Sequence, residues 1–213
     1  MKPADPIKFQ QWGWPKRKFY KEQQEILQSV VENKETYVPA ANVMGKDYVA
    51  GFTCPWFFLT RSPCKIVTTS ASEDHLKVLW GEMQDWINDC QYPLIYPKGP
   101  LIVNHLHIKR VIMTGPKKGE IDPLSYIVGK VASPDRIASM QGHHVAKTGD
   151  GIPRTLFLPD ECSSIPNSYY TMASGWFHRM LAIGNCWESD NSTWWKNNTE
   201  AGDKEYPKGE LII

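Results

Sequence analysis

Residues 38–47, with the sequence VPAANVMGKD, constrain the fold of this chain more than any other segment. Tyr37-Val38 ends a short strand-like run, and Gly45-Lys46 then opens a helix-compatible stretch from Asp47 to Phe52. A tight turn between a strand and a helix directs successive backbone N–H groups at one point, and the helix N-terminus adds positive partial charge. The segment therefore predicts a phosphate-binding loop for a nucleoside triphosphate, with Lys46 as the cation for the β- and γ-phosphates.

This loop departs at two positions from the usual pattern G-x-x-x-x-G-K-[ST]. Ala40 stands in place of the first glycine, and Asp47 stands where a Ser or Thr hydroxyl normally binds Mg²⁺. Taken alone, the segment favours an ordinary glycine turn with a surface Lys, so a second motif is needed to support a phosphate site. The residues that the pattern places at the nucleotide are Ala40, Ala41, Asn42, Val43, Met44, Gly45, Lys46, Asp47 and Tyr48.

The second motif is the run TLFLPDE at residues 155–161, which predicts a buried strand with two carboxylates at its C-terminal tip. In phosphate-loop ATPases the first such carboxylate holds the Mg²⁺ shell, and the second polarises the attacking water. The long interval between Lys46 and Asp160 leaves room for the other elements of one α/β sheet. An ordinary strand with an acidic turn is the alternative. Pro159 removes a ladder hydrogen bond, so the strand must end or be unpaired there.

A third apolar run, MLAI at residues 180–183, is followed by Gly184-Asn185. A small polar amide at a strand tip suits a group that senses the γ-phosphate or the attacking water, although a plain Gly-Asn turn has the same sequence. Strands that alternate with helices along the chain predict α/β layers around a mainly parallel sheet. Ligands of such sheets bind at the C-terminal tips of the strands, where Ala40, Asp160 and Asn185 are expected to meet.

In their order and spacing, these motifs resemble those of the ATPase domain of the large terminase subunit of tailed bacteriophages. QQEIL at residues 23–27 is similar to the family's adenine-recognition element, ANVMGK at 41–46 to its phosphate loop, and LAIGN at 181–185 to its coupling motif. The run KIVTTSA at 65–71 with the helix after it, and MQGHH at 140–144 before the acidic pair, also resemble that family. The resemblance extends from about residue 20 to residue 195.

The resemblance implies an α/β fold with a RecA-like phosphate-loop NTPase core. The mainly parallel sheet would carry helices on both faces, and a small lid-like segment would follow at the C-terminus. We expect residues 1–20 to form an N-terminal arm that lies on the core and residues 21–190 to form the ATPase core. Residues 191–213 would form the lid or the start of a linker to a missing nuclease domain, so no nuclease activity is expected of this segment.

The resemblance also implies a function, that of an ATP-hydrolysing motor that translocates double-stranded DNA into a viral procapsid. ATP and Mg²⁺ would be its cofactors. Its partners would be double-stranded DNA, the portal and the small terminase subunit. We expect a homo-oligomeric ring when the motor is assembled, a monomer when it is isolated, no association with a membrane, and a location in the cytoplasm of the infected bacterial host.

The resemblance gives a role to each binding motif. Lys46 and the loop amides would hold the phosphates, and Gln23 would recognise adenine. Asn185 would couple the state of the γ-phosphate to movement of the lid. Residue 186 is Cys, where the family often has Pro.

The hydrolytic roles fall on the acidic residues. Asp160, with Asp47, would hold Mg²⁺, and Glu161 would orient and deprotonate the attacking water. The loop lacks the Arg that many members of the family have there, so an arginine finger must come from elsewhere. Arg136 and Arg179 are the candidates.

The composition of the chain argues against several other classes of protein. The 213 residues are 41% hydrophobic and 22% charged, which is typical of one globular domain, and no apolar run is long enough to span a membrane. The five cysteines form no C-x-x-C pair, which argues against a zinc site or a disulfide scaffold. The net charge of +1 gives no sign of tight DNA binding, because phosphate contacts dominate that affinity. DNA as a partner therefore rests on the resemblance.

Local patterns predict further elements. We expect an amphipathic helix at 22–33, a helix at 47–60 broken by Pro55, a strand at 64–70 and a helix at 72–89. Strands are expected at 101–103, 105–113 and 126–132, with loops at 92–100, 115–125 and 144–154 and a short helix at 135–140. His105 and His107 would share a strand face, and two half-buried strand residues are favoured over a metal pair.

Two other functions stay open from the sequence. A helicase-like nucleic-acid translocase has a similar core, but it requires a second motor core or downstream helicase motifs, and neither is present in this sequence. A catalytically weak, nucleotide-binding scaffold that docks on a portal is favoured by Asp47 and by the missing loop Arg. ATP binding without turnover, even in the assembled state, would identify the scaffold.

Overall fold

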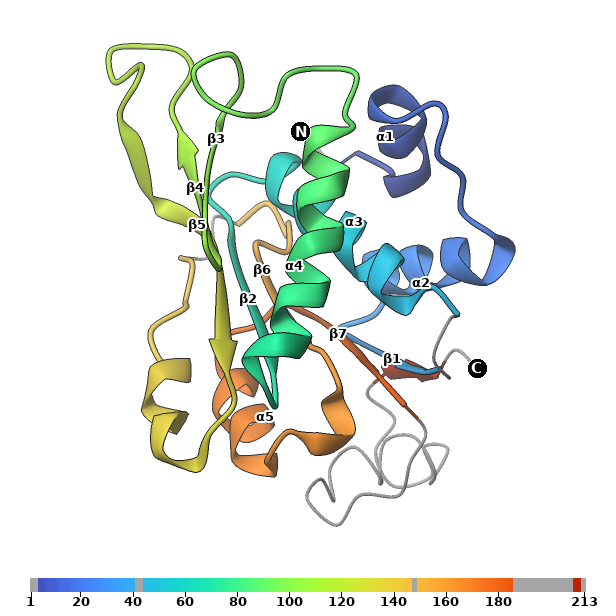
Figure 1. The fold of residues 1–213 in the computed structure, drawn as a ribbon. Helices are drawn as coiled ribbons and strands as arrows, with labels where there is room; N and C mark the ends of the chain where they lie inside the picture. Colours follow the sequence, from blue (N-terminus) through green and yellow to red (C-terminus); the bar gives the residue numbers. More distant parts are fainter. Residues whose placement is uncertain (1–3, 41–43, 147–148, 186–208, 212–213) are drawn as a thin grey trace.

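The computed structural model describes residues 4–40, 44–146, 149–185 and 209–211. An eight-stranded sheet runs through the molecule in the order β3-β4-β5-β2-β6-β7-β1-β8 (Figure 1). The strands are β1 (Glu35–Pro39), β2 (Lys65–Ser70), β3 (Leu101–Asn104), β4 (His107–Val111), β5 (Ile121–Val131), β6 (Thr155–Pro159), β7 (Arg179–Gly184) and β8 (Gly209–Leu211). The helices are α1 (Pro6–Gly13), α2 (Lys21–Glu32), α3 (Lys46–Leu59), α4 (Glu73–Asn88) and α5 (Asn167–Ser174), with 3₁₀ turns η1 (Pro134–Met140) and η2 (Cys162–Ser164).

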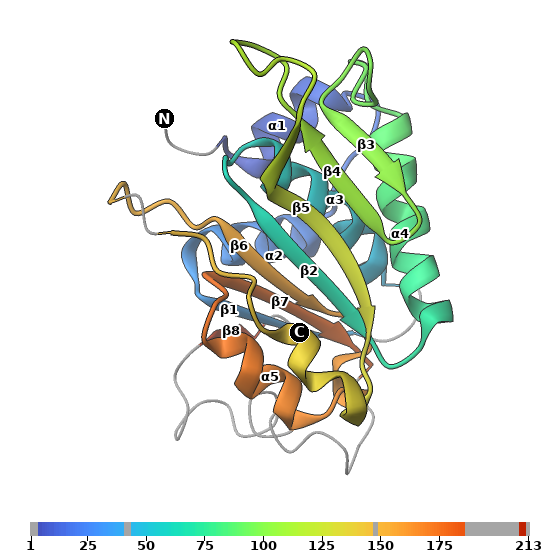
Figure 2. The same cartoon turned by 90° about the vertical axis from the view of Figure 1, so that its left-hand side faces the viewer.

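The sheet is mainly parallel, as the alternation of strands and helices predicts. All pairings among β5, β2, β6, β7, β1 and β8 are parallel, whereas β3 and β4 form an antiparallel hairpin that adds to the edge of β5. In Figure 2 the arrows of β2, β5, β6 and β7 point the same way, so their carboxyl ends share one edge of the sheet. The predicted α/β fold is confirmed.

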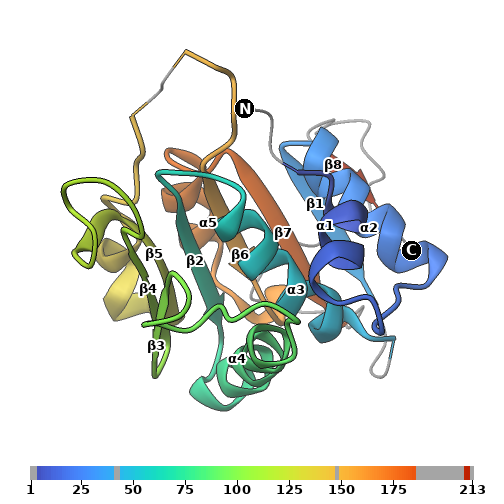
Figure 3. The same ribbon diagram turned by 90° about the horizontal axis from the view of Figure 1, so that it is seen from above.

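Each face of the sheet has its own hydrophobic core, because successive side chains of a strand point to opposite faces. On β6, Leu156 and Leu158 belong to the core that α1–α4 cover, whereas Phe157 between them packs against α5 on the other face. Figure 3 shows α5 and the pair α3–α4 on opposite sides of the sheet. Burial on both faces explains why the central strands are continuously apolar rather than alternating.

The prediction that Pro55 breaks the helix after the loop is wrong. Helix α3 continues from Lys46 to Leu59 with Pro55 inside it. Every residue from Val49 to Phe58 is buried, and α4 lies so close that a Cβ on Gly51 would meet the Cβ of Glu82 at 2.9 Å. The packing of this buried stretch against α4 stabilises α3 by more than the cost of about 3 kcal/mol that an internal proline imposes on a helix.

The predicted helix at 72–89 is confirmed as α4. The Ser72 hydroxyl caps it by accepting a hydrogen bond from the backbone N–H of His75. The face that periodicity marks as apolar is the buried one, and it consists of Leu76, Leu79, Trp80, Met83, Trp86 and Ile87. The helix predicted at 22–33 is α2, and its buried side chains lie on the same face of the sheet as those of α4.

Two expectations for the hairpin region are wrong. His105 lies in the turn between β3 and β4 rather than on a strand, because Leu106 adopts a left-handed conformation with φ of 47° and ends the extended chain. The two histidines therefore do not share a strand face. The loop predicted at 115–125 is shorter than expected, since β5 begins at Ile121 and pairs with Val111 of β4.

At the two ends of the chain, the structure adds to the sequence predictions. The N-terminal arm contains α1 and lies on the core, where the Trp14 indole donates a hydrogen bond of 2.6 Å to the carbonyl of Trp86. Most of the predicted lid at 191–213 lies outside the described residues, but Gly209–Leu211 form β8, parallel to β1. None of the helices in the described part is long and apolar enough to cross a membrane.

Candidate functional site

Three neighbouring strands bring the predicted motifs to the same edge of the sheet. The order β6-β7-β1 places the carboxyl ends of these parallel strands side by side. Asp160-Glu161 follow β6, Asn185 follows β7, and the segment after β1 leads into α3 at Lys46. The backbone joins two of these ends directly, because the Ala40 N–H donates a hydrogen bond of 2.9 Å to the carbonyl of Gly184.

Lys46 is a buried cation that faces two carboxylates. It is the first residue of α3 and is only 6% exposed. Its Nζ lies 3.5 Å from Glu161 Oε1 and 3.9 Å from Asp47 Oδ2. The structure therefore brings Lys46 of the predicted phosphate loop together with the acidic pair, although more than a hundred residues of sequence lie between them.

Glu161 is held in an unusual backbone conformation. It has a positive φ of 48°, in the left-handed region that non-glycine residues rarely adopt. Its Oε2 accepts a hydrogen bond of 3.4 Å from Nδ2 of Asn185. Gly184 makes this approach possible, since a Cβ there would meet the backbone nitrogen of Cys162 at 2.9 Å. The other amide atom, Asn185 Oδ1, is buried without a hydrogen-bond partner among the described residues.

Asp160 is a buried carboxyl, with 3% of its surface exposed. Burial raises its pKa to about 7, and the nearby carboxylates of Asp47 and Glu161 add to the shift. Burial also raises the pKa of Asp47, which the Lys46 ammonium partly offsets. One hydrogen bond of 2.8 Å, from the Glu161 N–H to Asp160 Oδ1, stabilises the charged form of Asp160.

Three carboxyls and one ammonium leave this site with an excess of negative charge. A divalent cation would remove that repulsion, so the donor set fits Mg²⁺, with Asp47 and Asp160 as the side chains that could hold it. No group of three or more potential ligands forms a ready metal cage in the part of the chain that the structure describes.

Gly45 and Gln23 form a contact that the sequence did not predict. Gly45 precedes α3 with a φ of 73°, and a Cβ on it would meet Gln23 Nε2 at 2.6 Å. The Gln23 side chain is buried, and its Oε1 accepts a hydrogen bond of 3.1 Å from the N–H of Tyr20. The Tyr20 ring, three residues before Gln23, is 75% exposed. The predicted adenine residue thus lies directly against the phosphate loop.

The remaining residues of the predicted loop are only partly described by the structure. Ala41, Asn42 and Val43 lie outside the described residues, and Met44 is exposed. The ring of Tyr48 packs at 5.6 Å from Phe19 and 4.8 Å from Trp86, so its side chain belongs to the aromatic core rather than to the edge of the sheet.

The two candidate arginine fingers lie at different edges. Arg179 is the first residue of β7, so about 20 Å of extended strand separates it from Asn185 at the other end. Its guanidinium donates to the carbonyls of His178 and Val31. Arg179 therefore does not reach the site of its own chain. Arg136 is exposed on η1, which follows the carboxyl end of β5.

The fold is similar to that of solved structures of phage large terminases. The Thermus phage P74-26 large terminase ATPase domain matches with a TM-score of 0.61 and 14% sequence identity, over 92% of this chain and 74% of that one. The HK97 bacteriophage large terminase matches with a TM-score of 0.58 and 10% identity, over 98% of this chain and 42% of that one. The chain has the fold of a phage large terminase ATPase domain.

Sequence comparison adds nothing to this structural match, since no family model and no curated protein matches the chain. The large terminase of a second thermophilic bacteriophage, solved in complex with ADP, has a TM-score of 0.56 and 14% identity. This chain covers 44% of that protein, which is less than half of its length. The RecA-like core that the sequence implied is confirmed at the level of the fold.

Proposed function

We propose that this chain is the ATP-hydrolysing motor domain of a viral DNA-packaging terminase. One observation carries the proposal, namely the approach of the buried Lys46 ammonium to Glu161 at the edge where β6, β7 and β1 end. A buried cation beside a water-activating carboxylate, at the N-terminus of a helix, is the arrangement that phosphoryl transfer requires. The fold, and the ADP in the complex of one structural neighbour, support a nucleotide as the ligand.

Binding of ATP would use the groups that the loop and α2 present. Lys46 and the loop amides would hold the β- and γ-phosphates, and Gln23 would recognise the adenine through its amide. Tyr20 is exposed next to Gln23 and is placed to stack on the base. The phosphates would compete with Glu161 for the Lys46 ammonium, which lies 3.5 Å from Glu161 Oε1.

Hydrolysis would use the acidic pair and the amide. Glu161, released from Lys46, would orient the attacking water and accept its proton. Asn185, which donates to Glu161, would link the position of that carboxylate to the chain that follows β7. Mg²⁺, when bound at Asp160 and Asp47, would neutralise charge on the phosphates.

An isolated chain is expected to turn over ATP slowly, because no arginine lies in the described part of the loop. We infer that Arg136 of a neighbouring subunit completes the site in a ring, since it is exposed on the same side of the sheet as the carboxyl ends. Double-stranded DNA, the portal and the small terminase subunit would be the partners of such a ring in the cytoplasm of an infected bacterium.

Steady-state ATP turnover of Lys46→Ala and Glu161→Ala tests the proposal. Both variants should lose turnover, since one removes the phosphate cation and the other removes the base. Lys77→Ala on the exposed face of α4 is the matched control and should keep wild-type turnover. Unchanged turnover in both site variants would overturn the assignment.

A catalytically weak scaffold is the second candidate, and the position of Asp47 favours it. Its carboxylate lies 3.9 Å from Lys46 Nζ, where it competes with the phosphates for the ammonium. Tight ATP binding without turnover in the assembled ring would select the scaffold over the motor. A helicase-like translocase would instead separate the strands of a duplex in an unwinding assay.

A further inference from the structure

A cavity lies at the edge of the sheet opposite the acidic site. Its volume is about 570 Å³, and it lies at the amino ends of β1, β6 and β7. Four basic side chains line it together with Phe177 and the loop before β6, and these are Lys34, Arg154, His178 and Arg179. In the chain they precede or begin three different strands, so only the fold brings them together.

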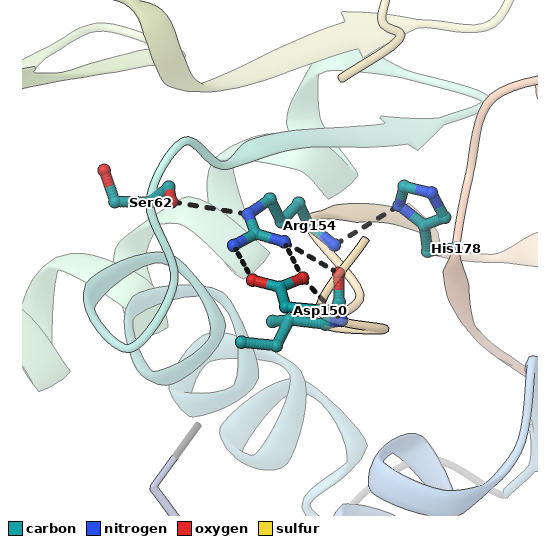
Figure 4. Close-up of polar contacts among 5 residues, drawn as sticks. Ser62, Asp150, Arg154 and His178 are labelled. Carbon is teal, nitrogen blue, oxygen red and sulfur yellow. Dashed lines mark hydrogen bonds and ion pairs between the residues drawn. The ribbon is translucent and has the colours of Figure 1, made fainter. Parts of the chain in front are cut away.

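Arg154 lines this cavity, and hydrogen bonds hold its side chain in place. Its guanidinium pairs with Asp150 through two hydrogen bonds of 2.8 and 2.7 Å and also donates to the carbonyls of Ile152 and Ser62. Its backbone N–H donates to Nδ1 of His178 at 3.2 Å, which leaves the ring proton of a neutral His178 on Nε2. Figure 4 shows Arg154 between Ser62, Asp150 and His178. The charge of Arg154 is therefore largely compensated.

Two other cations of the cavity have no such compensation. Lys34 is exposed, its Nζ lies 5.0 Å over the Phe177 ring, and it forms no ion pair with any described residue. Arg179 donates only to carbonyl oxygens, and its buried Nε has no hydrogen-bond partner among the residues described. Neutral acceptors leave the full positive charge of Arg179 at the cavity.

Lys65 adds a positive charge on β2, outside the lining of the cavity. Its Nζ donates a hydrogen bond of 2.8 Å to the carbonyl of His144 and has no carboxylate partner among the described residues. It begins β2 and pairs in register with Thr155 of β6, while Leu156 pairs with Arg179 of β7. Four neighbouring strands, β2-β6-β7-β1, therefore present basic residues within about one residue of the same level. At about 4.8 Å between strands, these cations extend over roughly 14 Å, or about four steps of 3.4 Å along a DNA strand.

The carboxylates at this edge do not cancel the charge. Asp150 is paired with Arg154, and Glu35 is buried with its carboxylate bound to the Tyr37 hydroxyl. Glu32 at the end of α2 is exposed, and its carboxylate accepts from the neutral amide of Gln28. Lys34, Lys65 and Arg179 therefore outnumber the carboxylate that remains among the described residues of this edge. We name these three residues, together with the cavity that Lys34 and Arg179 line, the basic edge.

We propose that the basic edge binds the phosphate backbone of a nucleic acid. Spaced cations without carboxylate partners gain free energy by releasing the counterions of a polyanion, and a row of phosphates offers the matching charges. That the polyanion is duplex DNA rests on the proposed motor function. The uncompensated charges of the basic edge would attract the phosphates of any nucleic acid.

The test is a titration of fluorescently labelled duplex DNA at salt concentrations from about 50 to 200 mM. The variant is the double substitution Lys34→Gln/Lys65→Gln. If both lysines contact phosphates, the slope of log affinity against log salt should become shallower by about 2, since each contact contributes about 0.9. Lys34→Gln alone, which removes no hydrogen bond or ion pair given above, should change the slope by about 1.

Lys16→Gln/Lys18→Gln is the matched control, since it removes two exposed lysines from the linker between α1 and α2. It should keep the wild-type slope. An unchanged slope in the basic-edge variant, an equal change in the control, or no DNA binding by the wild type would overturn the site.

Basal ATP turnover without DNA, measured on the same proteins, separates the two proposals. Wild-type turnover with an unchanged slope in the basic-edge variant would reject the basic edge and keep the motor. A shallower slope in that variant, with no ATP turnover in any protein, would keep the basic edge and reject the motor.

Discussion

The two edges of the sheet carry opposite charges. The carboxyl edge holds Asp47, Asp160 and Glu161 around one lysine. The amino edge holds Lys34, Lys65 and Arg179, where Asp150 is paired, Glu35 is buried and Glu32 is exposed. A net charge of +1 conceals this separation. It shows that overall charge is a poor guide to the ligands of a parallel sheet, whose two edges are built from different loops.

The largest expected effect concerns completion of the carboxyl edge by a neighbouring subunit. Arg136→Ala should lower ATP turnover of assembled rings by about 10³–10⁵, which is the contribution of an arginine finger, and should leave the slow turnover of the isolated chain unchanged. Mixed rings of Arg136→Ala and Lys46→Ala subunits test whether the finger acts between subunits. ATP turnover should partly recover in them, because Arg136 of one subunit can complete the intact site of its neighbour. Equal loss in the isolated chain would show that Arg136 acts within its own subunit.

The pH dependence of stability tests whether ionisation of the buried Asp160 destabilises the folded protein. The pKa of Asp160 is raised to about 7, well above the value of about 3.9 in an unfolded chain. The folded protein therefore keeps a proton that the unfolded chain releases, and the stability it provides is full below about pH 4 and lost as the pH rises to 7. The free energy of unfolding, measured without nucleotide or Mg²⁺, should fall relative to Asp160→Asn by up to about 1.4 kcal/mol per pH unit in this window. Parallel pH profiles for the two proteins would contradict the assignment.

Mg²⁺ should determine whether the carboxyl edge accepts a triphosphate. A unit charge about 4 Å from another costs roughly 1 to 4 kcal/mol, so Asp47 should weaken ATP binding by roughly fivefold to several hundredfold when Mg²⁺ is chelated. ATP affinity measured by calorimetry, with Mg²⁺ and with chelator, should show this difference. Asp47→Ser should reduce it, and equal affinity of the wild type in both conditions would rule out a carboxylate beside the phosphates.

The smallest expected effect is on stability at the start of α3. Gly45→Ala forces a side chain onto a φ of 73° and toward Gln23, so it should lower the free energy of unfolding by about 1–3 kcal/mol. Gly81→Ala on α4 is the control, because a Cβ there meets nothing, and it should stabilise the protein by about 0.5–1 kcal/mol. Chemical denaturation measures both, and equal effects of the two substitutions would show that Gly45 is not constrained.

The carboxyl edge could largely be predicted from the sequence, because each of its motifs is local. The apolar runs before Asp160 and before Asn185 predict strands that end at these polar residues, and parallel strands share an edge. The contact of Gln23 with Gly45 could not be predicted, since it depends on how α2 packs beside the loop. Pro55 was misjudged for the same reason, because burial of α3 outweighs a local preference.

The basic edge had no signal in the sequence. Lys34, Lys65 and Arg179 are single residues in unrelated segments, and only the strand order β2-β6-β7-β1 places them together. The sequence makes Arg179 a candidate finger for the nucleotide, but the length of β7 puts it at the opposite edge of the sheet. The turn at His105 depends on the conformation of one residue, Leu106, which no periodicity indicates.

The most direct test of the central claim is to measure ATP binding and ATP turnover together for Glu161→Gln. This substitution keeps the size of the side chain and removes its ability to accept a proton. We expect ATP binding close to that of the wild type and turnover reduced by about 10²–10⁴, the usual contribution of a general base. Wild-type turnover in Glu161→Gln would contradict the account.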